Sequence, residues 1–406
     1  MPKKSSLVDM FVSDFYHLSY CTNVHPGENW DVTFNSLKTY TLKVKQSISP
    51  EKPFGIGLRL SNKASEELGV GNNLVGFKKW LDENELYVYT INGFPYGNFH
   101  NEKVKENVHR PDWLSQKRLA YTARLFKQLA VLLPEPLSGG ISTSPISYKH
   151  WFTSKAEVHQ AKSVSAANMA EIAVQLYEIE HTKGVYLHLD IEPEPDGLLE
   201  NAQDVIDFFS AYLVPISIKA FKKKIGLGEV AAEKLTKRYV TICYDICHFS
   251  LAYEEPKDTF QKFGENGIQI GKIQVSSALK ILYDSNTINE IWQSLELFDE
   301  PTYLHQVTEK RDNKVLTYSD LPLVLNERKN FKELRAHFHV PIFLERFGHL
   351  HATQDHIKKV LQCLKMHKIC SHIEVETYTW DVLPNTLKRE LSESIIREME
   401  WLKEKL

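Results

Sequence analysis

Four segments of this sequence end in polar side chains that could bind a metal ion. In each segment apolar and polar residues alternate, which places the polar side chains on one face of a β-strand. These polar faces end in the carboxylates of Glu192, Asp245 and Glu376 and in the amide of Gln274. His248 follows Asp245 by three residues, and it reaches the same place only if the chain bends after Asp245. Together these side chains would form an oxygen-rich site for a divalent cation.

The elements that would position these side chains form a repeating pattern. Short β-branched and aromatic runs alternate with longer segments of helical periodicity, as in repeated βα units with parallel strands. The count of eight strands, with no G-x-G-x-x-G after the first, favours the α/β fold of a (β/α)8 TIM barrel over a doubly wound sheet. The predicted strands cover residues 15–24, 53–61, 85–93, 139–145, 184–193, 239–248, 268–276 and 371–380.

Alternation of apolar and polar residues has two explanations. It usually marks an antiparallel strand with one face in water. In a chain of βα repeats, helices cover the outside of the sheet, so the polar side chains must face the barrel interior. Uncompensated carboxylates there would cost several kcal/mol each unless they are paired or bind a metal. The four polar residues also lie at the carboxyl ends of their strands, where barrel enzymes place their chemistry.

The whole chain, residues 1–406, is predicted to be one TIM-barrel domain with an insertion. Residues 277–352 are too long for one connection between the seventh and eighth strands, and they contain a further strand or hairpin. We expect this insertion to contribute to the cleft. Residues 387–406 are predicted to form a charged amphipathic helix that covers the barrel.

The composition is that of an ordinary globular protein, with 42% hydrophobic and 25% charged residues. A net charge of -3 gives no overall basic field, so nucleic-acid binding is disfavoured and a small-molecule metabolite is the expected partner. The five cysteines include no C-x-x-C pair, which argues against a zinc ribbon or a disulfide framework. Neither a leader-like segment nor a run of about 18 apolar residues is present, so we expect a cytoplasmic protein without a membrane span.

Several short motifs resemble those of known proteins. The motif "DICH" after the sixth strand, Glu192 at the end of the fifth and "VET" at the end of the eighth resemble the xylose isomerase-like TIM barrels. That superfamily includes sugar isomerases, ketose 3-epimerases and endonuclease IV. The longer stretches "CYDICHFSLAYEEP", "GKIQVSSAL" and "RAHFHVPIF" are similar to the EboE family of metabolite-traffic proteins, which is associated with moving secondary-metabolite precursors.

The resemblance implies a ligand set for the metal. The superfamily's ligands would fall on Glu192, Asp245 and Glu376, and Gln274 stands where the family usually has a histidine. His248 would contact the substrate or a second metal. The motif "HFH" (337–339) resembles the Asp-x-His of endonuclease IV, with a histidine at position 337 in place of the aspartate. These two departures, with the net charge, argue against a phosphodiesterase.

The chemistry that follows is proton transfer next to a carbonyl group. Three carboxylates and an amide form a hard ligand set, which favours Mn²⁺ or Mg²⁺, with Zn²⁺ as the alternative. Such an ion would polarise a ketose carbonyl, and Glu192 and Glu376 could then remove and return a proton on either face. With His248, they are the predicted catalytic residues of an isomerase or epimerase for a carbohydrate-like or polyhydroxylated metabolite. The alternative is an EboE-type protein that binds a precursor and hands it on unchanged.

Six further residues are predicted to contact the substrate. Lys272 alternates with apolar residues, so its side chain is expected to face the barrel interior. It could form a Schiff base with a substrate, or it could instead pair with Glu374 or Asp190. The remaining five are histidines that follow strands, share the interior parity or belong to the insertion: His25, His100, His188, His305 and His339.

Overall fold

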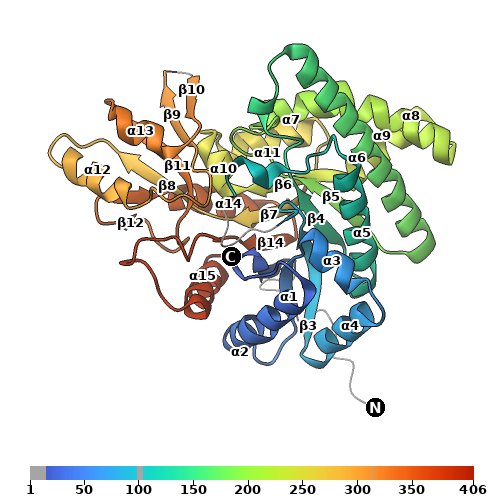
Figure 1. The fold of residues 1–406 in the computed structure, drawn as a ribbon. Helices are drawn as coiled ribbons and strands as arrows, with labels where there is room; N and C mark the ends of the chain where they lie inside the picture. The colour runs from blue at the N-terminus through green and yellow to red at the C-terminus, as the bar shows by residue number, and fades with distance from the viewer. Residues whose placement is uncertain (1–14, 98–103, 313) are drawn as a thin grey trace.

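Eight parallel strands form a barrel at the centre of the molecule (Figure 1). The computed structural model describes residues 15–97, 104–312 and 314–406. Neighbouring strands follow the order β1-β14-β7-β6-β5-β4-β3-β2, and a parallel bridge between Cys21 and Gly57 joins the first strand to the last. The predicted TIM barrel is confirmed. Its strands are β1 (His17–Tyr20), β2 (Phe54–Arg59), β3 (Leu86–Asn92), β4 (Gly139–Thr143), β5 (Leu187–Ile191), β6 (Val240–Asp245), β7 (Ile270–Val275) and β14 (His372–Val375).

Helices surround the barrel, as Figure 1 shows. The longest, α6, begins with a capping box between Ser154 and Glu157 and ends at Gly184, whose φ of 71° suits a glycine. None of the helices in the described ranges is both long and apolar enough to cross a membrane. The α-helices around the barrel are α1 (Trp30–Ser36), α2 (Leu42–Ile48), α3 (Asn62–Leu68), α4 (Asn73–Glu83), α5 (Gln116–Leu132), α6 (Lys155–Lys183), α7 (Ala202–Phe208), α8 (Val214–Ile225), α9 (Glu229–Tyr239), α10 (Ile246–Leu251), α11 (Pro256–Glu265), α14 (Gln354–Met366) and α15 (Leu391–Lys405).

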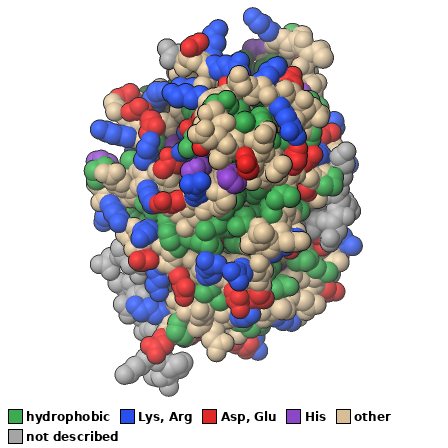
Figure 2. Space-filling model, turned by 90° about the vertical axis from the view of Figure 1, so that its left-hand side faces the viewer, with side chains coloured by type: hydrophobic (Ala, Val, Ile, Leu, Met, Phe, Trp, Pro, Cys, Tyr) green, Lys and Arg blue, Asp and Glu red, His purple; other side chains and the backbone are tan. Residues whose placement is uncertain are grey.

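The segment between β7 and α14 builds a second sheet beside the barrel, drawn in yellow and orange in Figure 1. Its strands pair antiparallel in the order β10-β9-β11-β8-β13-β12. Seen from this side, positive and negative side chains are interspersed around a hydrophobic band (Figure 2). The elements are β8 (Ala278–Leu282), α12 (Ile288–Glu296), β9 (Val307–Arg311), β10 (Lys314–Tyr318), α13 (Leu321–Glu327), β11 (Glu333–His339), β12 (Arg346–Phe347) and β13 (Leu350–Ala352).

The barrel interior holds a set of buried polar side chains, which we call the interior network: His188, Asp190, Thr241, Lys272 and Glu374. His188 Nδ1 lies 2.5 Å from an Asp190 carboxylate oxygen, and Lys272 Nζ lies 2.5 Å from a Glu374 carboxylate oxygen. A Cβ atom on Gly57 would overlap the Glu374 carboxylate, so this strand position must be a glycine for the network to fit.

Candidate metal centre

The end of β6 bends sharply, as the spacing of Asp245 and His248 requires. Helix α10 begins at Ile246, directly after the strand, and Asp245 is its N-cap residue. The Asp245 Oδ1 atom accepts hydrogen bonds from the His248 backbone N–H at 3.1 Å and from the Ser276 hydroxyl at 2.7 Å. The bend therefore brings the carboxylate and the imidazole to the same end of the barrel, and it fixes one oxygen of the carboxylate.

Three carboxylates from three strands meet at this end of the barrel, and we call them the carboxylate cluster: Glu192, Asp245 and Glu376. Each offers an oxygen within 4.8 Å of the others, and all three residues are buried. Glu376 Oε1 accepts hydrogen bonds from the amides of Asn23 at 2.8 Å and Asn92 at 2.9 Å. These amides set the orientation of the Glu376 carboxyl group.

The three carboxyl groups differ in proton affinity because their neighbours differ. Burial raises the pKa of Glu192 well above its usual value, and the nearby Asp245 charge raises it further. The pKa of Glu376 is also raised well above its usual value, by burial and by Glu192. Burial alone would raise the pKa of Asp245, but His248, His339 and the hydrogen bond from Ser276 hold it below the usual value. The cluster thus favours an ionised Asp245 beside two glutamates that hold protons more tightly.

Two histidines face each other beside the cluster. His248 Nδ1 lies 3.0 Å from the backbone oxygen of Pro193, and His337 Nδ1 lies 2.9 Å from the side-chain oxygen of Gln306. Because these oxygens can only accept, both Nδ1 atoms carry the hydrogen, and in the neutral rings both Nε2 atoms carry a lone pair. The two Nε2 atoms are 3.1 Å apart. Such a pair is favourable only when a proton or a cation binds to it.

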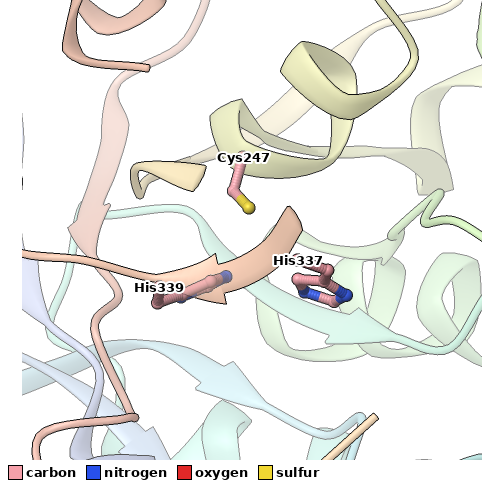
Figure 3. A group of neighbouring side chains, drawn as sticks. All are labelled: Cys247, His337 and His339. Atoms are coloured by element: carbon pink, nitrogen blue, oxygen red, sulfur yellow. The ribbon is translucent and has the colours of Figure 1, made fainter. Parts of the chain in front are cut away.

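His339 has the same orientation as these two histidines. Its Nδ1 donates to the backbone oxygen of Glu376 at 2.8 Å, which leaves Nε2 as the acceptor. Figure 3 shows His337 and His339 on β11 beneath Cys247 of α10. The three side chains have ligand atoms within 4.8 Å of one another. Burial raises the pKa of the Cys247 thiol well above its usual value, so this sulfur remains a protonated, weak ligand.

The donor atoms fit a divalent cation. Glu192 Oε2, Asp245 Oδ2 and His339 Nε2 are buried and have no hydrogen-bond partner within the described part of the chain. Buried polar atoms without partners are costly, and a bound ion would satisfy Asp245 together with its neighbours in either group. Carboxylate oxygen and imidazole nitrogen together suit Mn²⁺, Zn²⁺ and related ions.

A cavity of about 70 Å³ opens above these groups. Its floor is polar, and its upper walls come from the β3 loop, the loop before α5, the second sheet and the segment after β14. The polar lining residues are Asn23, Asn92, Lys105, His109, Glu192, Glu194, His248, Gln306, His337 and Glu376. The apolar and aromatic ones are Phe94, Pro95, Val104, Val108, Tyr303, Leu304 and Tyr378.

Five of the predicted site residues come together at this end of the barrel: Glu192, Asp245, His248, His339 and Glu376. Gln274 pairs in register with Asp245 on β6 and with Glu374 on β14. Its amide oxygen accepts from the Cys243 thiol at 2.9 Å. Ser276 follows β7, and its hydroxyl donates to Asp245.

The other predicted substrate contacts among the described residues lie outside the lining of the cavity. His188 and Lys272 belong to the interior network, so the ion pair of Lys272 with Glu374 is the explanation that the structure bears out. His25 lies 3.0 Å from the Tyr20 hydroxyl and stacks on Tyr40. The two ring nitrogens of His305 lie within hydrogen-bond distance of Glu300 and of the backbone oxygen of His337, so His305 helps to hold β11 in place. The prediction for His100 falls outside the described residues.

Sequence reasoning missed several polar residues of the site, among them Asn23, Asn92, Glu194 and His109. Asn23 follows β1 and Asn92 ends β3, so their position at strand ends is a signal that the sequence already contains. Glu194 lies two residues beyond Glu192 and 3.1 Å from His109 Nε2. Nothing in the local sequence around His109 distinguishes it from the other histidines.

Comparisons with known proteins give a likeness of fold. No family model matches the chain, and no curated protein matches its sequence. Among solved structures, it is similar to a D-tagatose 3-epimerase-like protein, with 11% identity over 96% of both chains and a TM-score of 0.48. A xylose isomerase-like TIM barrel protein from Mycobacterium smegmatis in complex with magnesium has 9% identity over 96% of both chains and a TM-score of 0.48.

A third similar structure is the IolI protein with a bound zinc atom, with 11% identity over 95% of both chains and a TM-score of 0.47. At this level of similarity the three structures carry no argument about the reaction, the ligand or the metal of this chain. The similarity to the EboE family, seen in short sequence stretches, has no support from these comparisons.

Proposed function

We propose that this protein is a metal-dependent isomerase or epimerase that moves a proton next to the carbonyl group of a polyhydroxylated metabolite. The observation that carries the proposal is the carboxylate cluster, in which buried carboxyl groups with opposed pKa shifts meet at the floor of a cavity. Groups with strongly shifted pKa values in a cavity are typical of acid–base catalysis.

Each member of the cluster has a proposed task. Asp245, held ionised, binds the cation. Glu192 takes the proton from the carbon next to the carbonyl, and Glu376, oriented by Asn23 and Asn92, returns a proton from the other side. A divalent cation held by the cluster would polarise the carbonyl group and acidify that C–H bond. His248 contacts the substrate's oxygen atoms.

The cavity walls favour a substrate that is hydroxylated at one end and uncharged at the other. The upper wall is built from apolar and aromatic side chains, including Phe94, Val108 and Leu304. Within the described lining, Lys105 is the single Lys or Arg side chain, and it pairs with Asp320 at 2.6 Å. A phosphate group would lack an available cation there, so we infer an uncharged, apolar substituent instead.

A second candidate is a binding protein of the EboE type, which would hold a secondary-metabolite precursor without changing it. The observation that favours it is the same apolar wall, since such walls increase retention of a ligand without assisting proton transfer. Both candidates use a small-molecule ligand and neither requires nucleic acid.

Hydrogen exchange of a substrate separates the two candidates. Wild-type protein with Mn²⁺ or Mg²⁺ is expected to exchange a C–H proton of ketoses or cyclic ketopolyols with deuterated water, as followed by NMR. Glu192→Gln is nearly isosteric and should lower the exchange rate by about 10²–10⁴ because it removes the base. Glu398→Gln is the matched control, since it alters a buried carboxyl outside the cavity lining.

Two outcomes would contradict the assignment. Equal exchange rates in the wild-type and Glu192→Gln proteins would remove Glu192 from the mechanism. If every tested ketose and ketopolyol binds to the metal-loaded wild-type protein and none exchanges, the binding protein is the better description.

A further inference from the structure

We propose that His339, from the second sheet, supplies the nitrogen ligand of the metal centre, in the role that Gln274 was expected to fill from β7. The inference rests on the metal site of the proposed function, and it concerns which residue completes that site. Under this proposal, residues of both the barrel and the second sheet bind the metal.

The orientation of His339 is already that of a metal ligand. The backbone oxygen of Glu376 accepts the hydrogen of Nδ1 at 2.8 Å, so the lone pair of Nε2 points away from that bond. Metal-binding histidines usually donate their other ring hydrogen to such an oxygen, which fixes the tautomer and the ring. Here the oxygen belongs to Glu376, a member of the carboxylate cluster, so the hydrogen bond fixes the position of the imidazole relative to the cluster.

The position of His339 is equally specific. The residue is 1% exposed, and its Nε2 has no hydrogen-bond partner within the described residues. A ring nitrogen lies within 4.8 Å of ligand atoms of both Asp245 and His248. Asp245 in turn lies within 4.8 Å of Glu192 and Glu376. Asp245 is thus the residue that the two groups share, and a cation bound to Asp245 would be the partner that this nitrogen lacks.

Gln274 has a different environment. Its amide oxygen, the only atom that could bind a cation, accepts from the Cys243 thiol at 2.9 Å. Gln274 pairs in register with Asp245 on β6 and with Glu374 on β14, so what sets it apart is this hydrogen bond and not its level in the barrel. Ser276, the residue after β7, donates its hydroxyl hydrogen to Asp245.

The exchange of ligand changes the expected metal preference. A set of three carboxylates and an amide favours hard ions, whereas three carboxylates and an imidazole raise the relative affinity for Mn²⁺, Co²⁺ and Zn²⁺. We therefore expect Mn²⁺ to bind more tightly than Mg²⁺.

The test is electron paramagnetic resonance of bound Mn²⁺, with no substrate and no activity measurement. Protein stripped with a chelator is titrated with Mn²⁺, the free ion is measured for the Kd, and electron spin echo modulation is recorded for a directly bound imidazole nitrogen. Wild-type protein is expected to show the nitrogen modulation. His339→Gln should lose it and should weaken Mn²⁺ binding by at least the ~10–100-fold that loss of an outer partner causes.

Two further variants make the result specific. Gln274→Met, which preserves the size of the side chain, should retain both the modulation and the Kd. His339→Asp should retain much of the affinity through a carboxylate oxygen while losing the modulation, and it serves as the informative variant if His339→Gln does not fold. His248→Gln and His337→Gln should leave the modulation in place.

The proposal is overturned if His339→Gln or His339→Asp retains the nitrogen modulation, or if Gln274→Met weakens Mn²⁺ binding as much as His339→Gln does. This result is independent of the proposed activity. An absence of isomerase activity with the nitrogen modulation intact would contradict only the function. Normal isomerase activity in His339→Gln with an unchanged Kd would contradict only the role of His339.

Discussion

The interior network and the carboxylate cluster both draw carboxylates from β5 and β14, two residues apart, and they solve the problem of buried charge in opposite ways. On β5 the network uses Asp190, and the cluster uses Glu192 just beyond the strand; at β14 the network uses Glu374 and the cluster Glu376. Each network carboxylate has a basic side chain 2.5 Å away.

The cluster has no such partner. Its closest basic side chain in the described salt bridges is His248, 3.8 Å from Glu192. Polar residues that alternate along a barrel strand can therefore be structural or functional, and the parity pattern does not distinguish them. The difference lies in charge balance: the network is neutralised by the chain itself, whereas the cluster is neutralised only when something binds.

The largest expected effect on stability comes from placing a side chain in the space that the Glu374 carboxylate occupies. Gly57→Ala would place a methyl group in the Glu374 carboxylate, with the backbone oxygen of Tyr20 also 2.9 Å away. Neither the buried carboxylate nor the backbone can move freely, so we expect the variant to be insoluble or unfolded. Soluble yield and a thermal melt measure this.

Gly76→Ala is the matched control for that experiment. Gly76 lies inside α4, and a Cβ atom there would meet nothing within 4 Å. The same substitution should stabilise the protein by about 0.5–1 kcal/mol, because alanine is the better helix former. A Gly57→Ala protein as stable as the wild type would show that the network adjusts easily, and the comparison of the two regions would fail.

Removing one charge from each region tests the comparison directly. Lys272→Met leaves Glu374 buried without its cation, which should lower the free energy of unfolding by about 3–5 kcal/mol. In the metal-free protein Glu376→Gln should not lower it, because the change removes one of three mutually repelling carboxyl groups and keeps the oxygen that Asn23 and Asn92 bind. Urea unfolding after chelation measures both. A greater loss in Glu376→Gln than in Lys272→Met would reverse the interpretation.

A pH-dependent effect is expected from a buried carboxyl outside both regions. Glu398 on α15 accepts from the Ile342 backbone N–H at 3.1 Å and from the Thr377 hydroxyl at 2.8 Å, and burial raises its pKa to about 8. A raised pKa stabilises the folded protein at low pH. This stabilisation decreases as the pH rises from about 4.3, the value of an unfolded glutamate, through 8, at about 1.4 kcal/mol per pH unit.

Glu398→Gln should remove this slope from the pH dependence of unfolding. Glu400→Gln, an exposed position on the same helix, is the control and should retain it. Urea titrations between pH 5 and pH 8 provide the measurement, and parallel curves for wild-type and Glu398→Gln proteins would contradict the assignment.

The fold was predictable because its signals are local. Eight runs with strand composition alternate with helical periodicity, and each of the eight predicted strands contains the observed one. The three carboxylates were predictable for the same reason, since a parity pattern that ends in Glu192, Asp245 or Glu376 can be read along a single strand.

The rest of the site depends on relations between strands. The pairing that puts Gln274 beside Asp245 and Glu374, and the hydrogen bond that its amide oxygen accepts from Cys243, are set across the sheet and cannot be read along one strand. The hydrogen bond that orients His339 joins β11 to the end of β14, and it exists only once the second sheet has packed on the barrel. Asn23 and Asn92 are neutral amides, and the pattern of apolar and charged residues does not single them out as site residues.

The bond between the His339 ring and the Glu376 backbone also has a consequence for biosynthesis. In the proposed centre Glu376 would contribute a side-chain oxygen, while its backbone oxygen accepts from the ring of His339, and it is among the last residues of the barrel to leave the ribosome. A nascent or truncated chain that stops before β14 lacks both contributions, although it already contains Glu192, Asp245 and His339. Metal uptake should therefore follow translation rather than accompany it, and retained metal would distinguish full-length protein from prematurely terminated chains in a cell.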